Sequence, residues 1–397
     1  MRTVNFGLIG LGMMGREVAS AVMRWSHLVD MSVRPKIVSI CSRTLKPEVE
    51  EWYREGLGTV TQGTRDYREV LANPDVEAVY CAVPHHLHRE FYIDIIRSGK
   101  HLFGEKPFGI DKEANDAILE AAAAHPEVFV RCASQYYFAP GPQLIGRLVE
   151  ENFFGRIIEV ETEFLHSSDL NPEKPINWKR KAEYNGEYGC MGDLGMHILV
   201  LPFRAGWRPK NVHAYLSNLV PERPDGAGRP VLCDTWDNAT LWCEMRAGEK
   251  TAASAYTFPM TVKTHRISPG EKNTWAIRIK GMKGSVRFST KNINRIDILK
   301  YTGGEQNWER VDLGHETVFN TITGPIFEFG FSDAMLQLMA AYLYELEYGR
   351  PKATFAGCVT PEETGLSHRL FTAALESGAT GMIKAISPAK FKGRKKP

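Results

Sequence analysis

The sequence predicts an α/β protein that begins with a doubly wound parallel sheet and continues with an α+β domain around a large, mostly antiparallel open sheet. Three observations carry this prediction. Short apolar strands alternate with helices over the first 133 residues, longer runs with period-two alternation follow them, and 397 residues exceed one ordinary hydrophobic core. We therefore expect two domains, residues 1–133 and residues 134–397.

The chain opens with an apolar strand, a glycine loop and a helix. Gly10, Gly12 and Gly15 have G-x-G-x-x-G spacing. In such a loop the first glycine allows a tight turn, the second lets the backbone approach a pyrophosphate, and the third lets helix and strand pack closely. The N–H groups that open the helix, from Met13 and Met14 onward, favour negative charge. The stretch predicts a Rossmann-type dinucleotide site, and a simple glycine-rich turn is the alternative.

The remaining elements follow from hydrophobic periodicity and from turn and cap residues. In the first part we expect strands at 4–9, 36–41, 78–82, 101–104 and 128–133, and helices at 46–55, 66–71, 89–97 and 112–125. In the second part we expect a helix at 142–152 and strands at 157–165, 212–219, 239–245, 251–258, 275–279, 285–289 and 295–301. A loop is expected at 221–230. Two late helices, 332–348 and 361–377, are expected to cover one face of the antiparallel sheet.

Composition excludes several classes of protein. Apolar residues at 43% and charged residues at 24% are ordinary for a globular protein, and a net charge of +2 gives no basis for nucleic-acid binding. No apolar run approaches the roughly 20 residues of a membrane span, so no membrane association is expected. Seven cysteines without a C-x-x-C pair indicate buried free thiols and a cytoplasmic location. The alternative, a secretory signal over the first 21 residues, would remove the glycine loop.

The end of the second strand bears on the choice of cofactor. A site that prefers NAD usually carries Asp or Glu there, to bind the ribose 2′-hydroxyl. This chain has Ser42 and Arg43 instead. Arg43 could pair with a 2′-phosphate, which favours NADP over NAD. The alternative is an exposed Arg43, with NAD held by Ser42 and the main chain.

Glu105 and Lys106 follow the strand expected at 101–104. In an open α/β sheet, ligands bind beyond the carboxyl ends of the strands, so both residues should lie near the cofactor cleft. A lysine there can hold a hydroxyl or pass a proton. A surface lysine before a proline turn is the alternative.

Asp193 and His197 are four residues apart and would share one face of a helix. A carboxylate beside an imidazole can orient it and favour its protonated form, which suits proton transfer. The alternative is a helix-start aspartate with a packed histidine. No third ligand stands at a suitable spacing, so no metal site is expected.

Together these stretches resemble the Gfo/Idh/MocA oxidoreductases. The resemblance rests on the glycine loop, the A-V-P-H-H-L-H run at 82–88, the E-K-P at 105–107 and the G-D-L-G-M-H at 192–197. It implies that Lys106 contacts the reacting hydroxyl and the nicotinamide ribose of the cofactor. It also implies that Asp193 and His197 form the D-x-G-x-H motif of the family, with His197 as acid and base.

The resemblance also implies a set of cofactor-contacting positions. Glu105 and Pro84 match such positions, and His88 lies in the same matched run as Pro84. Gln135 stands where the family usually has the Asn of an Asn-x-Arg sequence. The aspartate that often follows the histidine of the family is Val200 here, which leaves the substrate open.

The stretch before the D-x-G-x-H motif resembles the W-R…K segment of sugar-oxidising members such as levoglucosan dehydrogenase. Trp178 could face a sugar ring, and Lys179, Arg180 and Lys181 could bind hydroxyls or an anionic group. The alternative is a core tryptophan with solvated cations. With Lys106, Asp193 and His197, these four residues are the expected substrate site.

The expected function is an NAD(P)-dependent oxidoreductase acting on a hydroxyl or keto group of a sugar, cyclitol or glycoside. One alternative on the same fold is an NAD-dependent glycoside hydrolase that works by transient oxidation and elimination. Another is a non-catalytic sensor, against which the intact Lys106, Asp193 and His197 argue. The resemblance further implies a homo-oligomer, a dimer or a tetramer.

Overall fold

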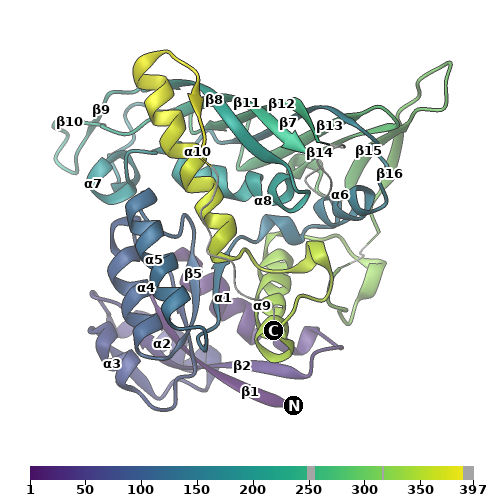
Figure 1. The fold of residues 1–397 in the computed structure, drawn as a ribbon. Helices are drawn as coiled ribbons and strands as arrows, with labels where there is room; N and C mark the ends of the chain where they lie inside the picture. Colours follow the sequence, from purple (N-terminus) through teal and green to yellow (C-terminus); the bar gives the residue numbers. More distant parts are fainter. Residues whose placement is uncertain (248–254, 315–316, 388–397) are drawn as a thin grey trace.

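The computed structural model describes residues 1–247, 255–314 and 317–387 of the chain. Two sheets dominate it, a parallel sheet built from the N-terminal part and a larger sheet built from the rest (Figure 1). Helices α6 (Pro140–Glu150) and α8 (Met196–Arg204) lie beneath the larger sheet in this view. Within the described residues no helix has the length and apolar character that a membrane crossing needs.

The first sheet has the order β3-β2-β1-β4-β5-β6, and all its pairs are parallel, which confirms the predicted doubly wound sheet. Its strands are β1 (Arg2–Ile9), β2 (Val33–Cys41), β3 (Gln62–Thr64), β4 (Ala78–Cys81), β5 (His101–Glu105) and β6 (Val130–Ala133). Its connecting helices are α1 (Met13–Met23), α2 (Pro47–Leu57), α3 (Tyr67–Ala72), α4 (His88–Arg97) and α5 (Lys112–Ala124). The strand order reverses between β1 and β4, so a crevice for a ligand is expected at the carboxyl ends of these strands.

The second sheet has nine strands in the order β16-β15-β14-β13-β7-β12-β11-β8-β17, and only β7 and β12 pair in parallel. Its strands are β7 (Ile157–Leu165), β8 (Arg208–Ser217), β11 (Asn238–Ala247), β12 (Tyr256–His265), β13 (Thr274–Gly281), β14 (Gly284–Ser289), β15 (Arg295–Lys300), β16 (Glu309–Asp312) and β17 (Lys384–Ala385). Its helices are α6 (Pro140–Glu150), α7 (Ala182–Asn185), α8 (Met196–Arg204) and α10 (Pro361–Thr380). The predicted large, mostly antiparallel sheet is confirmed.

Two local expectations need correction. The strand expected at 251–258 coincides with β12 only from Tyr256 on, while 251–254 lie outside the described residues. The loop expected at 221–230 carries a short antiparallel pair, β9 (Glu222–Pro224) and β10 (Pro230–Leu232). Its prolines and glycines indicated a turn, and they do form the turn between these two strands.

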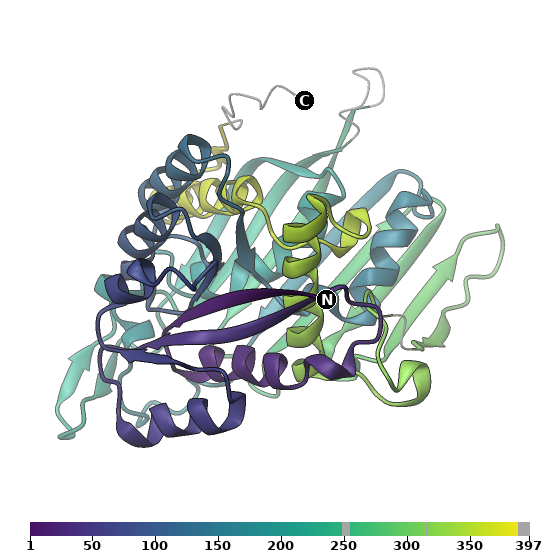
Figure 2. The same ribbon diagram turned by 90° about the horizontal axis from the view of Figure 1, so that it is seen from below.

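Helix α9 (Phe331–Tyr348) packs on the first sheet, although it follows the second sheet in the chain. Leu338 and Tyr342 are at most 1% exposed and share a core with Phe6 and Phe103. The rings of Tyr342 and Phe103 stack with their centroids 4.4 Å apart. Figures 1 and 2 show α9 beside the N-terminal elements. The expectation that both late helices cover the antiparallel sheet is therefore wrong for α9, while α10 does lie on β8. The domain division at residue 133 stays a prediction.

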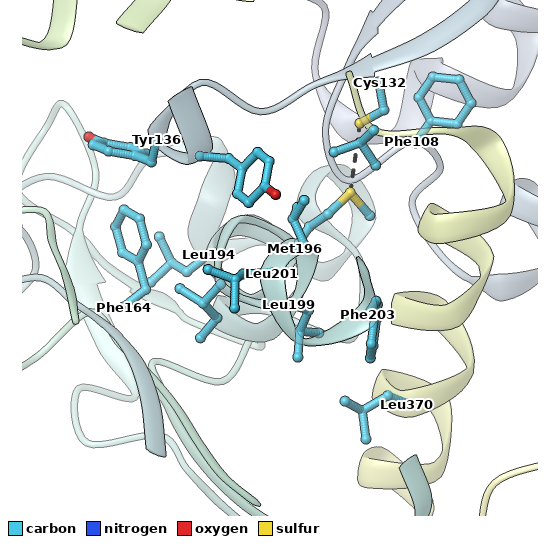
Figure 3. Close-up of a cluster of buried hydrophobic side chains, with 14 of the residues drawn as sticks. Phe108, Cys132, Tyr136, Phe164, Leu194, Met196, Leu199, Leu201, Phe203 and Leu370 are labelled. Atoms are coloured by element: carbon cyan, nitrogen blue, oxygen red, sulfur yellow. Dashed lines mark hydrogen bonds between the residues drawn. The ribbon is translucent and has the colours of Figure 1, made fainter. Parts of the chain in front are cut away.

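Helix α8 is buried between the two sheets from Met196 to Phe203. Leu199, Leu201 and Phe203 are at most 2% exposed, and the Met196 sulfur lies 3.7 Å from the Cys132 sulfur of β6 (Figure 3). A helix that is apolar all round belongs in a core. This packing fixes the segment that leads into α8, and with it Asp193 and His197, against the carboxyl end of β6.

Candidate active site

The turn between β1 and α1 is shaped by two glycines and left open by a third. Gly10 has a φ of 95°, and a Cβ there would lie 2.2 Å from the Ala82 carbonyl oxygen. A Cβ on Gly15 would lie 2.2 Å from the Gly10 carbonyl oxygen, whereas one on Gly12 would meet nothing within 4 Å. The fold therefore requires Gly10 and Gly15. Gly12 leaves a space in which a ligand can approach the backbone.

Helix α1 begins at this open turn. Gly12 is its N-cap, no side chain caps the helix, and its first turn holds no acidic residue. Met13 is 76% exposed and Met14 is half-buried. The first backbone N–H groups of a helix bind phosphate oxygens, and the helix dipole favours negative charge there. These donors fit the pyrophosphate of a dinucleotide.

The strand next to β1 ends beside the same crevice. Ser42 and Arg43 follow β2, and the Ser42 backbone N–H donates to the Thr64 carbonyl oxygen at 3.2 Å. Arg43 is exposed. This strand end carries no carboxylate for a ribose 2′-hydroxyl, as the sequence indicated.

In the run after β4, one of the residues predicted to contact the cofactor, His88, is buried and bonds to the protein instead. Pro84 follows β4 and is partly exposed. His88 is 0% exposed: its Nδ1 accepts the Gly109 N–H at 3.3 Å, and its Nε2 lies 3.1 Å from the Val83 carbonyl oxygen. Burial lowers the pKa of His88 to about 3. His88 thus ties together the loops after β4 and β5, so its expected contact with the cofactor is corrected to a structural one.

Glu105 and Lys106 lie at the carboxyl end of β5. Glu105 is 6% exposed and accepts the Tyr80 hydroxyl at 2.6 Å, while burial raises the pKa of its carboxyl. The Lys106 side chain reaches across to the second part of the chain. Its Nζ donates to the Asp193 carbonyl oxygen and to Asp193 Oδ1, both at 2.7 Å.

Asp193 is the centre of the site. Its side chain is 3% exposed and contacts three cations: Lys106, Lys179 at 3.1 Å from Oδ2, and Arg266, which donates to Oδ2. Burial alone would raise the pKa of Asp193, but Lys106, Lys179 and Arg266 hold it well below its usual range. Asp193 therefore stays ionised.

His197 has partners of its own. Its Nδ1 lies 3.0 Å from Ser134 Oγ, and its ring packs against Phe164 and Tyr136. Burial lowers the pKa of His197 to about 3. The expectation that Asp193 keeps His197 protonated is therefore wrong. Met191–Gly195 form a π-helical turn ahead of α8, so Asp193 and His197 do not lie on one regular α-helix, and no hydrogen bond joins their side chains among the described residues.

The tryptophan and the three cations at 178–181 separate into two pairs. Trp178 packs edge-on against His85 with ring centroids 5.0 Å apart, and Lys179 contacts Asp193. Arg180 is 0% exposed and pairs with Asp237 at 3.3 Å, and the Lys181 Nζ donates to the Leu232 carbonyl oxygen at 2.8 Å. Successive residues of the 3₁₀ turn Trp178–Arg180 point in different directions. The structure thus brings Trp178 and Lys179 to the site and gives Arg180 and Lys181 structural partners instead.

Two further positions complete the site. Arg266 follows β12 and was not predicted, because no motif surrounds it and only the strand order brings it to Asp193. Gln135 follows β6 and is 5% exposed, and its buried Oε1 has no hydrogen-bond partner among the described residues. An acceptor left without a donor fits the edge of a ligand site, in keeping with the expectation for Gln135.

Two sequence models of protein families match the chain. The one described as "Oxidoreductase family, NAD-binding Rossmann fold" matches residues 4–131. The one described as "GFO/IDH/MocA C-terminal domain" matches residues 143–287. The two matches follow one another along the chain and include Gly10–Gly15, Lys106, Asp193 and His197.

Known proteins with similar chains include a dehydrogenase and a hydratase. Levoglucosan dehydrogenase from Pseudarthrobacter phenanthrenivorans is 28% identical over 83% of this chain and 83% of its own length. A 2,7-anhydro-N-acetylneuraminate hydratase from Escherichia coli K12 is 25% identical over 49% of this chain and 47% of its own length. The solved structure of a levoglucosan dehydrogenase in complex with NADH and L-sorbose matches with a TM-score of 0.83 at 22% identity, over 98% of this chain and 100% of that chain. This last similarity shows a shared fold.

The open space at Gly12 generates a test. Gly12→Val should abolish NAD binding while leaving the melting temperature close to that of the wild type, because the added side chain enters only the space left for a ligand. Gly15→Val is the matched control, and it should lower the melting temperature because its Cβ meets the Gly10 carbonyl. Titration of NAD and thermal unfolding measure the two effects. Wild-type NAD affinity in Gly12→Val would show that the loop does not bind the dinucleotide.

Proposed function

Because this chain belongs to the Gfo/Idh/MocA family of oxidoreductases with a NAD-binding Rossmann fold, we propose that it transfers a hydride between NAD(P) and a hydroxyl or keto group of a sugar, cyclitol or glycoside. The observation that carries the proposal is the 2.7 Å contact between Lys106 Nζ and Asp193 Oδ1. It joins the carboxyl end of β5, which lies at the same end of the parallel sheet as the glycine loop after β1, to the segment that leads into His197. The similarity to levoglucosan dehydrogenase supports a sugar as substrate.

Lys106 and His197 are the groups we assign to the proton of the reacting hydroxyl. Lys106 has three N–H donors, two of which bond Asp193, so the third is available to a substrate oxygen. His197 is neutral near pH 7, since burial lowers its pKa to about 3, and with Nδ1 engaged by Ser134 its Nε2 can accept the proton. Asp193 positions Lys106. When bound, the nicotinamide supplies hydride acceptance in oxidation and hydride donation in reduction.

A second candidate function uses the same groups for cleavage or hydration rather than net oxidation. Transient oxidation of a sugar carbon, with hydride transfer to the dinucleotide, acidifies the neighbouring C–H and permits elimination. Return of the hydride to the oxidised carbon then restores the dinucleotide within each turnover. The similarity to a 2,7-anhydro-N-acetylneuraminate hydratase supports this candidate. A sensor without catalysis is disfavoured by the intact group of Lys106, Asp193 and His197.

Assembly and location complete the proposal. We propose a homo-oligomer, a dimer or a tetramer, that forms through the face of the nine-stranded sheet opposite α8, where Tyr215 is 66% and Trp242 is 48% exposed. The seven cysteines of the chain are buried and free, which supports a reducing, cytoplasmic compartment.

A panel of neutral and charged sugars with NAD and NADP distinguishes the two candidate functions. A dehydrogenase should accumulate reduced nucleotide in proportion to the sugar oxidised, measured by absorbance at 340 nm. Enzyme without substrate is the control. Product formed without accumulated reduced nucleotide would favour elimination, and an enzyme that binds neither nucleotide would contradict both candidates.

Removal of Lys106 or His197 should depress hydride transfer and leave nucleotide affinity unchanged. General acid–base groups contribute about 10²–10⁴-fold to the rate. The combined loss in Lys106→Ala with His197→Ala should fall short of the product of the single losses, because groups that act as a unit fail together. Single-turnover kinetics measure these effects, and Lys112→Ala on α5 is the surface control. Near-native turnover in His197→Ala would make His197 a packing residue.

The exposed Arg43 generates a prediction on cofactor choice. If its guanidinium pairs with a 2′-phosphate, NADP binds more tightly than NAD, and Arg43→Ala weakens NADP binding alone. Titrations of both nucleotides at equal salt measure this, with Arg34→Ala on β2 as the matched control. An equal or stronger affinity for NAD, unchanged in Arg43→Ala, would leave Arg43 without a role in cofactor choice.

A further inference from the structure

The group around Asp193 holds more positive than negative charge. Lys106, Lys179 and Arg266 all contact this one carboxylate. In the part of the chain that the structure describes, none of the three forms an ion pair with any other carboxylate. One buried acidic side chain therefore faces three basic ones.

The neighbouring titratable groups do not remove the excess. Glu105 adjoins Lys106, but burial raises the pKa of its carboxyl, and even when it is ionised the three cations outnumber the two carboxylates. His85, His166 and His197 also surround Asp193, and burial lowers the pKa of each. They are neutral near pH 7 and contribute no charge of either sign. The excess of positive charge thus belongs to the lysines and the arginine.

One of the cations also holds a buried hydrogen-bond donor that has no acceptor among the described residues. Arg266 is 4% exposed, and its Nε is buried with no partner among the described residues. The Lys179 side chain is 35% exposed, so it lies where the group meets solvent. Burying an unpaired donor of a charged group is costly, and an oxyanion that accepts from it removes that cost. The unpaired Nε of Arg266 and the excess of positive charge around Asp193 both indicate an anionic ligand as the partner of this group.

We infer that the substrate carries a carboxylate or phosphate group, which Lys179 and Arg266 bind beside the reacting hydroxyl at Lys106. This inference rests on the proposed function, since it names the chemical class of the substrate for that same site. Both oxyanions accept hydrogen bonds from ammonium and guanidinium groups, and a guanidinium can bind either in two-pronged fashion. Trp178 lies beside this anion site, since Lys179 Nζ is 5.7 Å from the centroid of its ring.

The test compares matched neutral and anionic ligands on the NADH-bound enzyme. The probes are D-glucose, D-glucuronate and D-glucose 6-phosphate, with the corresponding galactose and mannose triplets, and the readout is the ligand-induced rise in melting temperature. A lost hydrogen bond to a charged group corresponds to about 10- to 100-fold in affinity. We expect at least one anionic ligand to bind tighter than its neutral parent by about that factor, and the uronate and phosphate arms identify which oxyanion is bound.

Three variants separate recognition of the anionic group from packing. Lys179→Met should lower the affinity for the anionic ligand far more than that for its neutral parent, and so remove the preference, while leaving the affinity for NADH unchanged. Lys112→Met, which removes the same charge from the surface of α5, should change neither. Arg266→Lys, which keeps the charge, should retain the preference.

The possible results distinguish a failure of this inference from a failure of the proposed function. Equal affinity for neutral and anionic ligands across the panel, or an equal loss of both in Lys179→Met, would overturn the inference. Neutral sugars oxidised with accumulation of NADH would still support the proposed function in that case. Failure to bind NADH at all would contradict the proposed function itself.

Discussion

An ionised carboxylate that is 3% exposed persists only where cations and hydrogen-bond donors surround it, and at Asp193 these come from three separate segments of the chain. Lys106 comes from the end of β5, Lys179 from the turn before α7, and Arg266 from the end of β12. Because one carboxylate must be satisfied by all three, the two sheets are held in one relative position at this point. This polar contact adds to the apolar packing of α8, which holds the same segment against the first sheet.

The same region divides its polar groups between two environments. Asp193 lies among cations that keep it charged, whereas His197, on the following helix, lies between Phe164 and Tyr136 and stays neutral. Titratable groups whose surroundings shift their pKa values apart can take different chemical roles within one site. The aspartate is suited to hold a cation in place, and the imidazole is suited to accept a proton. Neighbouring positions in the sequence therefore carry separate functions.

Features that depend on neighbouring residues could be predicted from the sequence, whereas features that depend on contacts between distant segments could not. The glycine loop and the strand that ends at Glu105 are local patterns, and the structure places them as expected. The helical period of 332–348 predicted an apolar face, but not that this face covers the first sheet. The composition at 178–181 could not show that only Trp178 and Lys179 reach the site, because the turn fixes those directions. Arg266 had no local signal, since its place depends on the order of strands far apart in the chain.

The return of α9 to the first sheet has a consequence for how the protein is made. A ribosome delivers β1 to β6 long before it delivers Leu338 and Tyr342, so the apolar surface around Phe6 and Phe103 emerges without its cover. N-terminal domains usually fold first during synthesis, but here the first sheet completes its core only after most of the second sheet has left the ribosome. Because synthesis runs from the N-terminus, the first sheet completes its folding together with the second. Until α9 is synthesised, the N-terminal half exposes an apolar surface to which chaperones can bind.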